Sequence, residues 1–216
     1  MKVDLAAGTV SGEVDHFTKF AVLATEKATQ APPVTFKDIA GHWAKEAIEF
    51  MAAKGFLKGY PDGACRPDQP VTRAEFTALL VRVLSLPEAA EETFADVLPG
   101  AWHYRVIASA VHNGLVKGYS KNQFGPDDPV TREQVAALIT RALTAKGISA
   151  ELNEAQTAEL PGRFSDAGEI SAWAKTAAAA AVHQGLVSGY PDGTFGPQKT
   201  STRAECATML KRLSEK

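Results

Sequence analysis

A stretch of seventeen residues occurs three times in this chain and constrains its fold more than any other feature. The copies read GYPDGACRPDQPVTRAE from Gly59, GYSKNQFGPDDPVTREQ from Gly118 and GYPDGTFGPQKTSTRAE from Gly189. In each copy the first glycine lies thirteen positions before the threonine of a Thr-Arg pair. Because surface loops normally tolerate insertions and deletions, a loop of constant length indicates that something fixes its geometry.

The stretch belongs to a longer repeat, which spans residues 36–86, 94–145 and 164–216. Each copy opens with Phe-x-Asp and has a tryptophan sixteen residues before the first loop glycine. The aspartates are Asp38, Asp96 and Asp166, and the tryptophans are Trp43, Trp102 and Trp173. A repeat of this size cannot bury a core alone, so we expect the three to fold as one cooperative body.

The remaining segments divide into two joints and an N-terminal piece. Residues 87–93 join the first two repeats directly, whereas residues 146–163 form a longer polar linker in which a short helix is expected across 154–160. Residues 1–35 lie outside the repeat and are interpreted as the tail of an upstream domain plus a linker. Within them, 14–25 fits either a strand or a short helix, and consecutive prolines at 32 and 33 end either element.

Each repeat predicts two helices with the loop between them. After the tryptophan, apolar residues at spacings of three, four and seven predict an amphipathic helix that ends at Gly55, Gly114 or Gly185 in the left-handed conformation. These first helices are candidates for burying their apolar stripes against one another. A threonine followed three residues later by Glu or Gln then predicts a capping box at the start of a second helix. The fold class is therefore all-α, with three helix-loop-helix repeats.

The capping boxes and loops differ in detail between copies. The box residues are Thr72 with Glu75, Thr131 with Gln134, and Thr202 with Glu205. Apolar residues flank the first two boxes, but the third has Ser201 and Cys206, so a looser turn is expected there. Phe124 and Phe195 are predicted to plug the loop onto the body, with Cys65 in that place in the first copy.

Composition excludes several classes of protein. The formal charge of −2 over 216 residues argues against a nucleic-acid binder with a broad basic surface. No apolar run is long enough to cross a membrane, so no membrane insertion is expected. Cys65 and Cys206 have no metal-ligand spacing, and two buried free thiols are favoured over a disulfide. The histidines match no metal site, no catalytic constellation stands out, and we expect no cofactor.

The informative anomaly is an arginine at the first position of every second helix. A cation is disfavoured there by the helix dipole, by a few tenths to about 1 kcal/mol. With free backbone N–H groups at the helix start, the arginine would form an anion site, since a guanidinium binds a carboxylate through two parallel hydrogen bonds. The alternative is an internal salt bridge, for example to Asp38 or its equivalents. The arginines are Arg73, Arg132 and Arg203.

The other repeated residues also admit two interpretations each. The tryptophans are either core anchors or flat apolar platforms for the C–H face of a sugar ring. The aspartates either cap a helix or accept hydrogen bonds from sugar hydroxyls. Gly59, Gly118 and Gly189 are either ordinary turn glycines or positions where a ligand approaches the backbone closely.

The Phe-x-Asp opening, the tryptophan, the Gly-Tyr loop and above all the Thr-Arg-Ala-Glu signature resemble S-layer homology (SLH) repeats of bacterial cell-surface proteins. The resemblance covers residues 36–216 in three copies with fixed Trp–Gly–Thr spacing. It implies a pseudo-threefold trimer of lobes around a central three-helix bundle, with grooves between lobes. Those grooves would bind anionic secondary cell wall polysaccharide, often through a terminal pyruvylated N-acetylmannosamine whose ketal is a carboxylate.

Carried over residue by residue, the resemblance implies twelve ligand-binding positions, none of them catalytic. They are Asp38, Trp43, Gly59, Arg73, Asp96, Trp102, Gly118, Arg132, Asp166, Trp173, Gly189 and Arg203. The implied function is a secreted, non-catalytic module that anchors the remainder of a host surface protein to the cell wall. The second copy departs from the family pattern, with Arg-Glu-Gln in place of Arg-Ala-Glu. Two alternatives stay open: assembly of a protein lattice, and a glycan hydrolase using an acid pair such as Asp38 with Glu75.

Overall fold

The computed structural model describes residues 2–4, 9–11, 34–90 and 94–216, and the chain divides into two compact units, Met1–Pro32 and Pro33–Lys216. In the first unit, β1 (Lys2–Asp4) and β2 (Thr9–Ser11) pair antiparallel. The strand or helix considered for 14–25, and the proline linker, lie outside the described residues.

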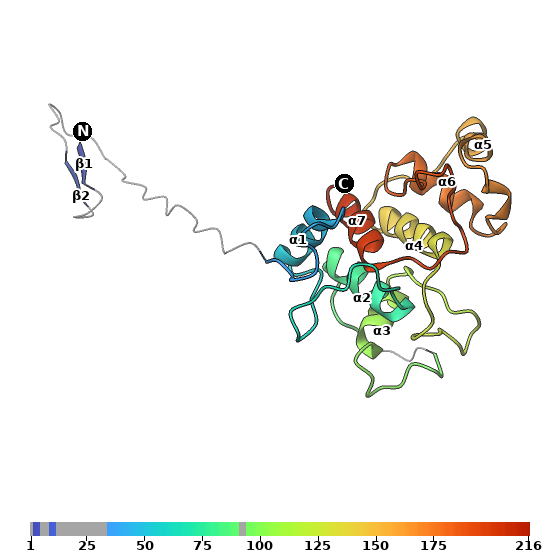
Figure 1. Ribbon diagram of the computed structural model, residues 1–216. Helices are drawn as coiled ribbons and strands as arrows, with labels where there is room; N and C mark the ends of the chain where they lie inside the picture. Colours follow the sequence, from blue (N-terminus) through green and yellow to red (C-terminus); the bar gives the residue numbers. More distant parts are fainter. Residues whose placement is uncertain (1, 5–8, 12–33, 91–93) are drawn as a thin grey trace, which may run out of the picture. The chain divides into compact units, whose positions relative to one another are not determined.

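The second unit is built from helices, and the all-α prediction is confirmed for it (Figure 1). The first helices of the three repeats are α1 (Lys45–Ala53), α3 (Tyr104–His112) and α6 (Lys175–His183). The second helices are α2 (Arg73–Val83), α4 (Arg132–Ala145) and α7 (Arg203–Ser214). The linker contains the expected short helix, α5 (Glu154–Arg163), and a 3-10 turn, η1 (Ala167–Glu169), follows it.

Local sequence chemistry sets the helix ends. The first helices stop just before Gly55, Gly114 and Gly185, whose φ angles are +73°, +67° and +71° as predicted. Thr72 and Thr202 form complete capping boxes, and Thr131 donates its backbone N–H to the Gln134 side chain at 3.2 Å. The turn before α7 therefore has a complete cap although Ser201 and Cys206 replace the apolar pair.

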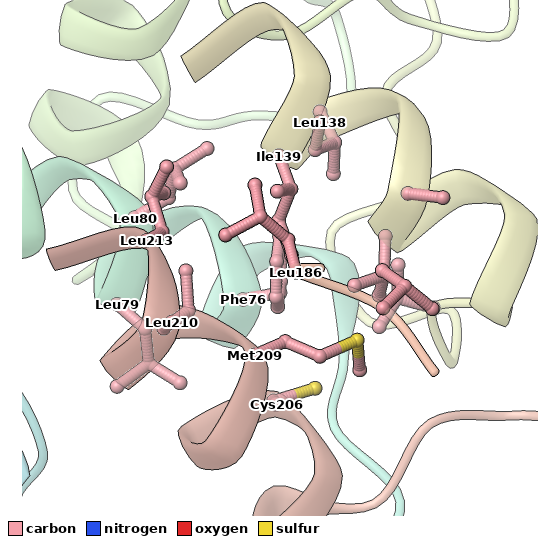
Figure 2. Packing of buried hydrophobic residues seen from close by; sticks show 14 of the residues in the cluster. Phe76, Leu79, Leu80, Leu138, Ile139, Leu186, Cys206, Met209, Leu210 and Leu213 are labelled. Carbon is pink, nitrogen blue, oxygen red and sulfur yellow. The ribbon is translucent and has the colours of Figure 1, made fainter. Parts of the chain in front are cut away.

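The helices of neighbouring repeats pack on one another across the repeat boundaries. In the described residues α2, α4 and α7 contact one another in every pair, whereas the first helices make no contacts among themselves. Instead α3 packs on α2, α6 on α4, and α1 on α7. The expectation that the first helices pack together is therefore wrong, because their apolar stripes face the second helix of the preceding repeat. Figure 2 shows side chains of all three second helices in this core, among them Leu80, Ile139 and Leu210.

Three backbone hydrogen bonds close the repeats into a cycle just before the second helices. Val71 N–H donates to Ser201 O at 3.0 Å, Ser201 N–H to Val130 O at 2.9 Å, and Val130 N–H to Val71 O at 2.9 Å. All three residues are fully buried. Because each repeat supplies one donor and one acceptor, no repeat can leave without breaking two of these bonds.

Candidate functional site

The backbone N–H groups at the start of each second helix are already occupied. Arg73 N–H donates to Asp128 O at 2.9 Å and Ala74 N–H to Pro126 O at 3.0 Å, both in the loop of the second repeat. The same pattern recurs at the other two starts, with the acceptors Lys199 and Pro197 for α4 and Gln69 and Pro67 for α7. An anion site formed by free helix N–H groups, as the sequence suggested, is therefore wrong.

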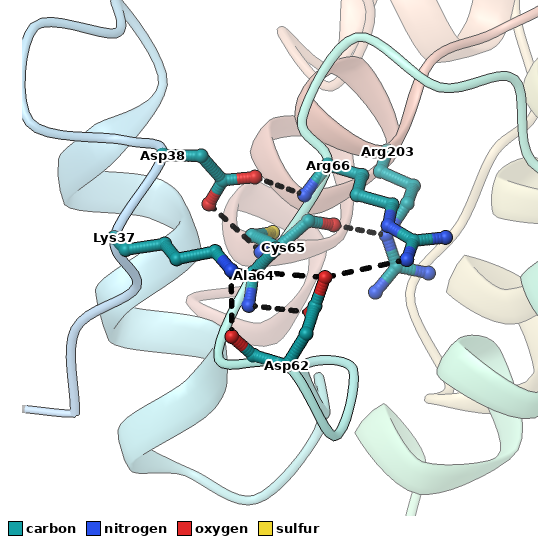
Figure 3. A network of polar contacts seen from close by, with 7 residues as sticks. All are labelled: Lys37, Asp38, Asp62, Ala64, Cys65, Arg66 and Arg203. Carbon is teal, nitrogen blue, oxygen red and sulfur yellow. Dashed lines mark hydrogen bonds and ion pairs between the residues drawn. The ribbon is translucent and has the colours of Figure 1, made fainter.

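The arginine side chains hold the Gly-Tyr loop of the next repeat in the cycle. Arg203 Nε donates to Cys65 O at 2.8 Å (Figure 3) and its Nη2 to Lys58 O at 2.9 Å. The guanidinium also lies 5.1 Å from the ring centroid of Tyr60, a cation–π contact. The arginines do pin a loop, as the structural alternative supposed, but through backbone carbonyls and not through Asp38.

Arg73 makes the equivalent contacts, and Arg132 makes part of them, since its Nε has no hydrogen-bond partner among the described residues. Arg73 donates to Phe124 O at 2.9 Å and to Lys117 O at 3.2 Å, and lies 4.4 Å from the Tyr119 ring. Arg132 donates to Ser188 O and lies 4.5 Å from the Tyr190 ring. All three arginines are buried. Each therefore serves as a structural clamp as well as a wall of the site described below.

The repeated aspartates cap the loops and not the helices. The Asp38 carboxylate accepts from Cys65 N–H at 2.8 Å and from Arg66 N–H at 2.7 Å (Figure 3). Burial by itself raises the pKa of Asp38, but the backbone hydrogen bonds to its carboxylate, led by those from Cys65 and Arg66, together lower it below its usual value of 3.8. Asp96 and Asp166 bind the equivalent amides of the second and third loops. The predicted helix-capping role is wrong.

The first loop glycines recur because of the phenylalanine that opens each repeat. A Cβ at Gly59 would overlap the ring of Phe36, and one at Gly189 would overlap Phe164. A Cβ at Gly118 would overlap Phe94 as well as two backbone carbonyls. None of these glycines has a positive φ, so close packing, and not backbone conformation, requires a residue without a side chain.

The tryptophans lie on the surface. Trp43, Trp102 and Trp173 are 65%, 61% and 57% exposed, respectively. A large apolar side chain is usually buried, so exposure at three equivalent positions leaves three indole faces available for contact. The core-anchor interpretation is therefore wrong, and the platform interpretation fits the geometry.

Each tryptophan borders a pocket to which all three repeats contribute. The Trp43 pocket, of about 400 Å³, combines Trp43 of the first repeat with Arg132 of the second and Gly189, Tyr190, Glu205 and Arg212 of the third. The Trp173 pocket, about 320 Å³, is lined by Trp173, Arg73, Lys117, Gly118, Tyr119, Gln134 and Arg141. The Trp102 pocket, about 190 Å³, is lined by Trp102, Arg203, Lys58, Tyr60, Glu75 and Arg82.

The structure brings together part of the predicted set. Every predicted tryptophan and arginine lines one of these pockets, and so do Gly118 and Gly189. Gly59 and the three aspartates do not line them, since the aspartates bind loop amides. Asp38 is likewise absent from the lining of the pocket that contains Glu75, so this pair does not face a shared cleft.

Three kinds of pocket residue escaped prediction: the tyrosine after the first glycine, the third residue of the second helix, and a second arginine. These arginines, Arg82, Arg141 and Arg212, each lie nine residues after the first one. Each donates to the carbonyl of the residue that follows the glycine helix stop, at 3.2 to 3.4 Å. Their constant spacing was a signal in the sequence that could have identified them.

The comparison with protein families identifies the repeats. The family model described as "S-layer homology domain" matches residues 35–77, 93–136 and 163–207. The chain belongs to the S-layer homology domain family. All twelve predicted positions fall inside the matched segments.

Relatives of this SLH chain include both enzymes and surface-layer proteins. It is 36% identical to an amylopullulanase of Thermoanaerobacterium thermosulfurigenes over 100% of its own length and 11% of the relative's. It is 37% identical to exoglucanase XynX of Acetivibrio thermocellus, over 85% of this chain and 16% of the relative. It is 30% identical to the surface-layer 125 kDa protein of Lysinibacillus sphaericus, over 83% of this chain and 15% of that protein. The SLH chain thus spans only 11% to 16% of these relatives.

SLH domains are non-catalytic and anchor surface proteins to the cell wall, and the relatives include S-layer proteins and glycosidases that carry such a domain. The chain is therefore an anchoring domain of the bacterial cell surface. Among its described residues, no helix has the length and apolar character needed to cross a bilayer.

Proposed function

We propose that this SLH domain binds an anionic secondary cell wall polysaccharide in the three tryptophan pockets, through a terminal N-acetylmannosamine that carries a pyruvate ketal. The observation that carries the proposal is an exposed indole beside a net positive pocket, repeated three times. The indole would cover the apolar face of the sugar ring, and the arginines would attract the ketal carboxylate.

The charges of the pockets support an anionic ligand. In each pocket the lining arginines and lysines outnumber the carboxylates among the described residues. The first arginine of each pocket is buried and donates to one or two loop carbonyls, so it supplies charge and a rigid wall. The second arginine is half-buried and can present donors to a ligand.

The test is a binding assay with purified chain and wall polymer before and after removal of the pyruvate groups. Binding to the pyruvylated polymer and loss of binding to the treated polymer are expected. The triple variant Trp43→Ala, Trp102→Ala, Trp173→Ala should lose binding, while its thermal unfolding stays within a few degrees of the parent because the side chains are exposed. Equal binding to both polymers would refute the carboxylate mechanism.

Two other outcomes would point elsewhere. If oligomers form without polymer, and the triple tryptophan variant binds polymer as well as the parent, the chain is a lattice assembly module. Release of sugar from the polymer would indicate a hydrolase, although the acid pair considered for that role does not face one pocket.

A further inference from the structure

The three pockets differ in charge. Among the described residues, the Trp173 pocket has three cationic side chains and no carboxylate, a net charge of +3. The Trp102 pocket has three cations and Glu75, a net +2, and the Trp43 pocket has two cations and Glu205, a net +1. The volumes do not follow this order, so charge and size are independent differences between the pockets.

One unit of this difference arises at the third residue of the second helix. The other sets the Trp43 pocket apart, because Ser188 stands there at the position of Lys58 and Lys117 in the other two pockets. Glu205 Oε2 lies 3.7 Å from Arg132 Nη1, and Glu75 Oε1 lies 3.9 Å from Arg203 Nη1. In both pockets a carboxylate therefore already lies beside the buried guanidinium that supplies positive charge to the site. A ligand carboxylate must work against this resident charge.

Gln134 occupies that position in the Trp173 pocket. Its Oε1 accepts from the Thr131 N–H at 3.2 Å, as the glutamates do in the other caps. The remaining group is an NH₂, which donates hydrogen bonds where the glutamates offer an acceptor. The substitution thus keeps the cap, removes a negative charge and adds a donor for an anion.

The carboxylates nearest to Arg73 do not replace the missing one. Asp96 and Asp128 stabilise the positive charge of Arg73. Neither forms an ion pair with it in the described structure, and neither lines the pocket. The Asp96 carboxylate accepts hydrogen bonds from the Phe124 and Gly125 amides. Asp96 also has equivalents at the other two loops, so it does not distinguish the pockets.

The turn before Trp173 is also held by a contact that the sequence pattern of the other repeats lacks. Glu133, where the other copies have alanine, accepts from Ser171 N–H at 2.9 Å and from Ser171 Oγ at 2.8 Å. Glu133 is buried, and Ser171 lies two residues before Trp173. The bonds fix the turn that carries the platform, which lowers the entropy lost when a ligand orders it.

We propose that the Trp173 pocket is the tightest of the three sites for a carboxylate-bearing sugar, and that Gln134 is the residue that sets this preference. The proposal rests on the proposed function, which names the ligand class but treats the pockets alike. The departure from Arg-Ala-Glu to Arg-Glu-Gln in the second repeat is then a specialisation of one site within the domain.

Because each pocket has one of the three tryptophans of the chain, ligand binding to each pocket can be measured separately by fluorescence. Replacing two of them by phenylalanine leaves one indole as a fluorescent reporter of its own pocket in an otherwise complete chain. Each single-tryptophan chain is titrated with the pyruvylated N-acetylmannosamine monosaccharide. The Trp173 reporter should give the lowest Kd, and Gln134→Glu in that chain should raise the Kd at least tenfold. Glu205→Gln in the Trp43 chain, the matched reciprocal change, should lower its Kd.

Ionic strength supplies a further check, because the difference is one of charge. The difference in Kd between the Gln134 and Gln134→Glu chains should narrow as the salt concentration is raised from about 0.05 to about 0.5 M, because the Debye length falls and charges are screened more strongly. An unchanged Kd in the Gln134→Glu chain, with binding intact, would overturn the proposal and leave the proposed function standing. If none of the three reporters responds to the sugar while all chains are folded, the proposed function fails and this proposal fails with it.

Discussion

The guanidinium of Arg203 donates to the carbonyl of Cys65, 138 residues earlier in the chain, and so joins the last repeat to the first. A second bond from the same side chain reaches Lys58 O. The residue that the sequence singles out for binding an anion is thus also the clamp that holds a neighbouring loop. This dual role determines how its variants should be read.

Arg203→Ala should lower the free energy of unfolding by about 2–4 kcal/mol, because it leaves two partly buried carbonyls without a charged donor. Arg203→Lys keeps the charge but not the fork of donors, so its free energy of unfolding should lie between those of the parent and Arg203→Ala. Urea unfolding measures both. The control is Arg105→Ala, since Arg105 is 66% exposed and pairs only with the exposed Glu88 in the described residues. A loss as large for the control as for Arg203→Ala would contradict the clamp.

Asp38→Asn should destabilise the fold by about 1 kcal/mol at neutral pH, because the amide can accept only one of the two loop N–H bonds and faces the other with a donor. The pKa of Asp38 is lowered in the folded chain. The contribution of its carboxylate to the free energy of unfolding is therefore complete above pH 3.8 and is lost as the pH falls through the pKa of the folded state. The difference between parent and variant should therefore shrink below pH 3.8. Denaturant unfolding at neutral and acidic pH measures it.

A matched variant makes that result specific to the loop bonds. Asp68→Asn removes a carboxylate that is 82% exposed and contacts only His42 among the described residues. It should leave the free energy of unfolding nearly unchanged at neutral pH. A pH-independent effect of Asp38→Asn would mean that its carboxylate charge is not what holds the loop.

Arg66 has a φ of +56°, whereas Gly125 and Gly196 occupy the equivalent positions with φ of +71° and +68°. An L-residue pays about 1–2 kcal/mol in this left-handed region. Arg66→Gly should relieve that strain but also lose the contact of the guanidinium with Tyr60 at 4.0 Å. Arg66→Ala loses the same contact and keeps the strain, so the glycine variant should be the more stable of the two by about 1 kcal/mol. Equal thermal stabilities of the two variants would argue against strain at this loop.

Ser201 is fully buried, and its hydroxyl has no hydrogen-bond partner among the described residues. The equivalent positions in the cycle of backbone bonds hold Val71 and Val130. Ser201→Val should raise the free energy of unfolding by about 1–2 kcal/mol, because it removes an unsatisfied polar group and adds apolar volume. Ser201→Ala separates the two effects, since it removes the hydroxyl without adding volume. A less stable valine variant would show that the centre of the cycle is too tightly packed to accept it.

Local chemistry was readable from the sequence, and assembly was not. The glycine helix stops and the threonine caps depend on residues within a few positions of each other, so Gly55 and Thr72 could be assigned correctly. The partner of Trp43 could not, because the arginine in its pocket is Arg132 of another repeat. Three equivalent copies of a motif make every pairing between copies equally consistent with the pattern. Only the packing of each first helix on the second helix of the preceding repeat selects one.

The same limit explains the misassigned groups. The helix-start amides were expected to be free because the first turn of a helix leaves its N–H groups without partners in the helix, yet the loop of the next repeat supplies the carbonyls. The first glycines were open to interpretation as ligand contacts because Phe36, which excludes a Cβ at Gly59, is 23 residues away in sequence. Features that depend on residues within a few positions were predictable, and those that depend on residues far apart in the sequence, in one repeat or in two, were not.

The packing of α1 on α7 gives the number of repeats a meaning of its own. A chain cut after its second repeat would leave α1 without the surface that covers it and would contain no complete pocket. The first helix of a fourth repeat would need the surface of α7, which α1 already covers. Three repeats therefore complete the cycle. A truncated chain could complete it only with a repeat from another molecule, which would turn a wall anchor into a cross-link between chains.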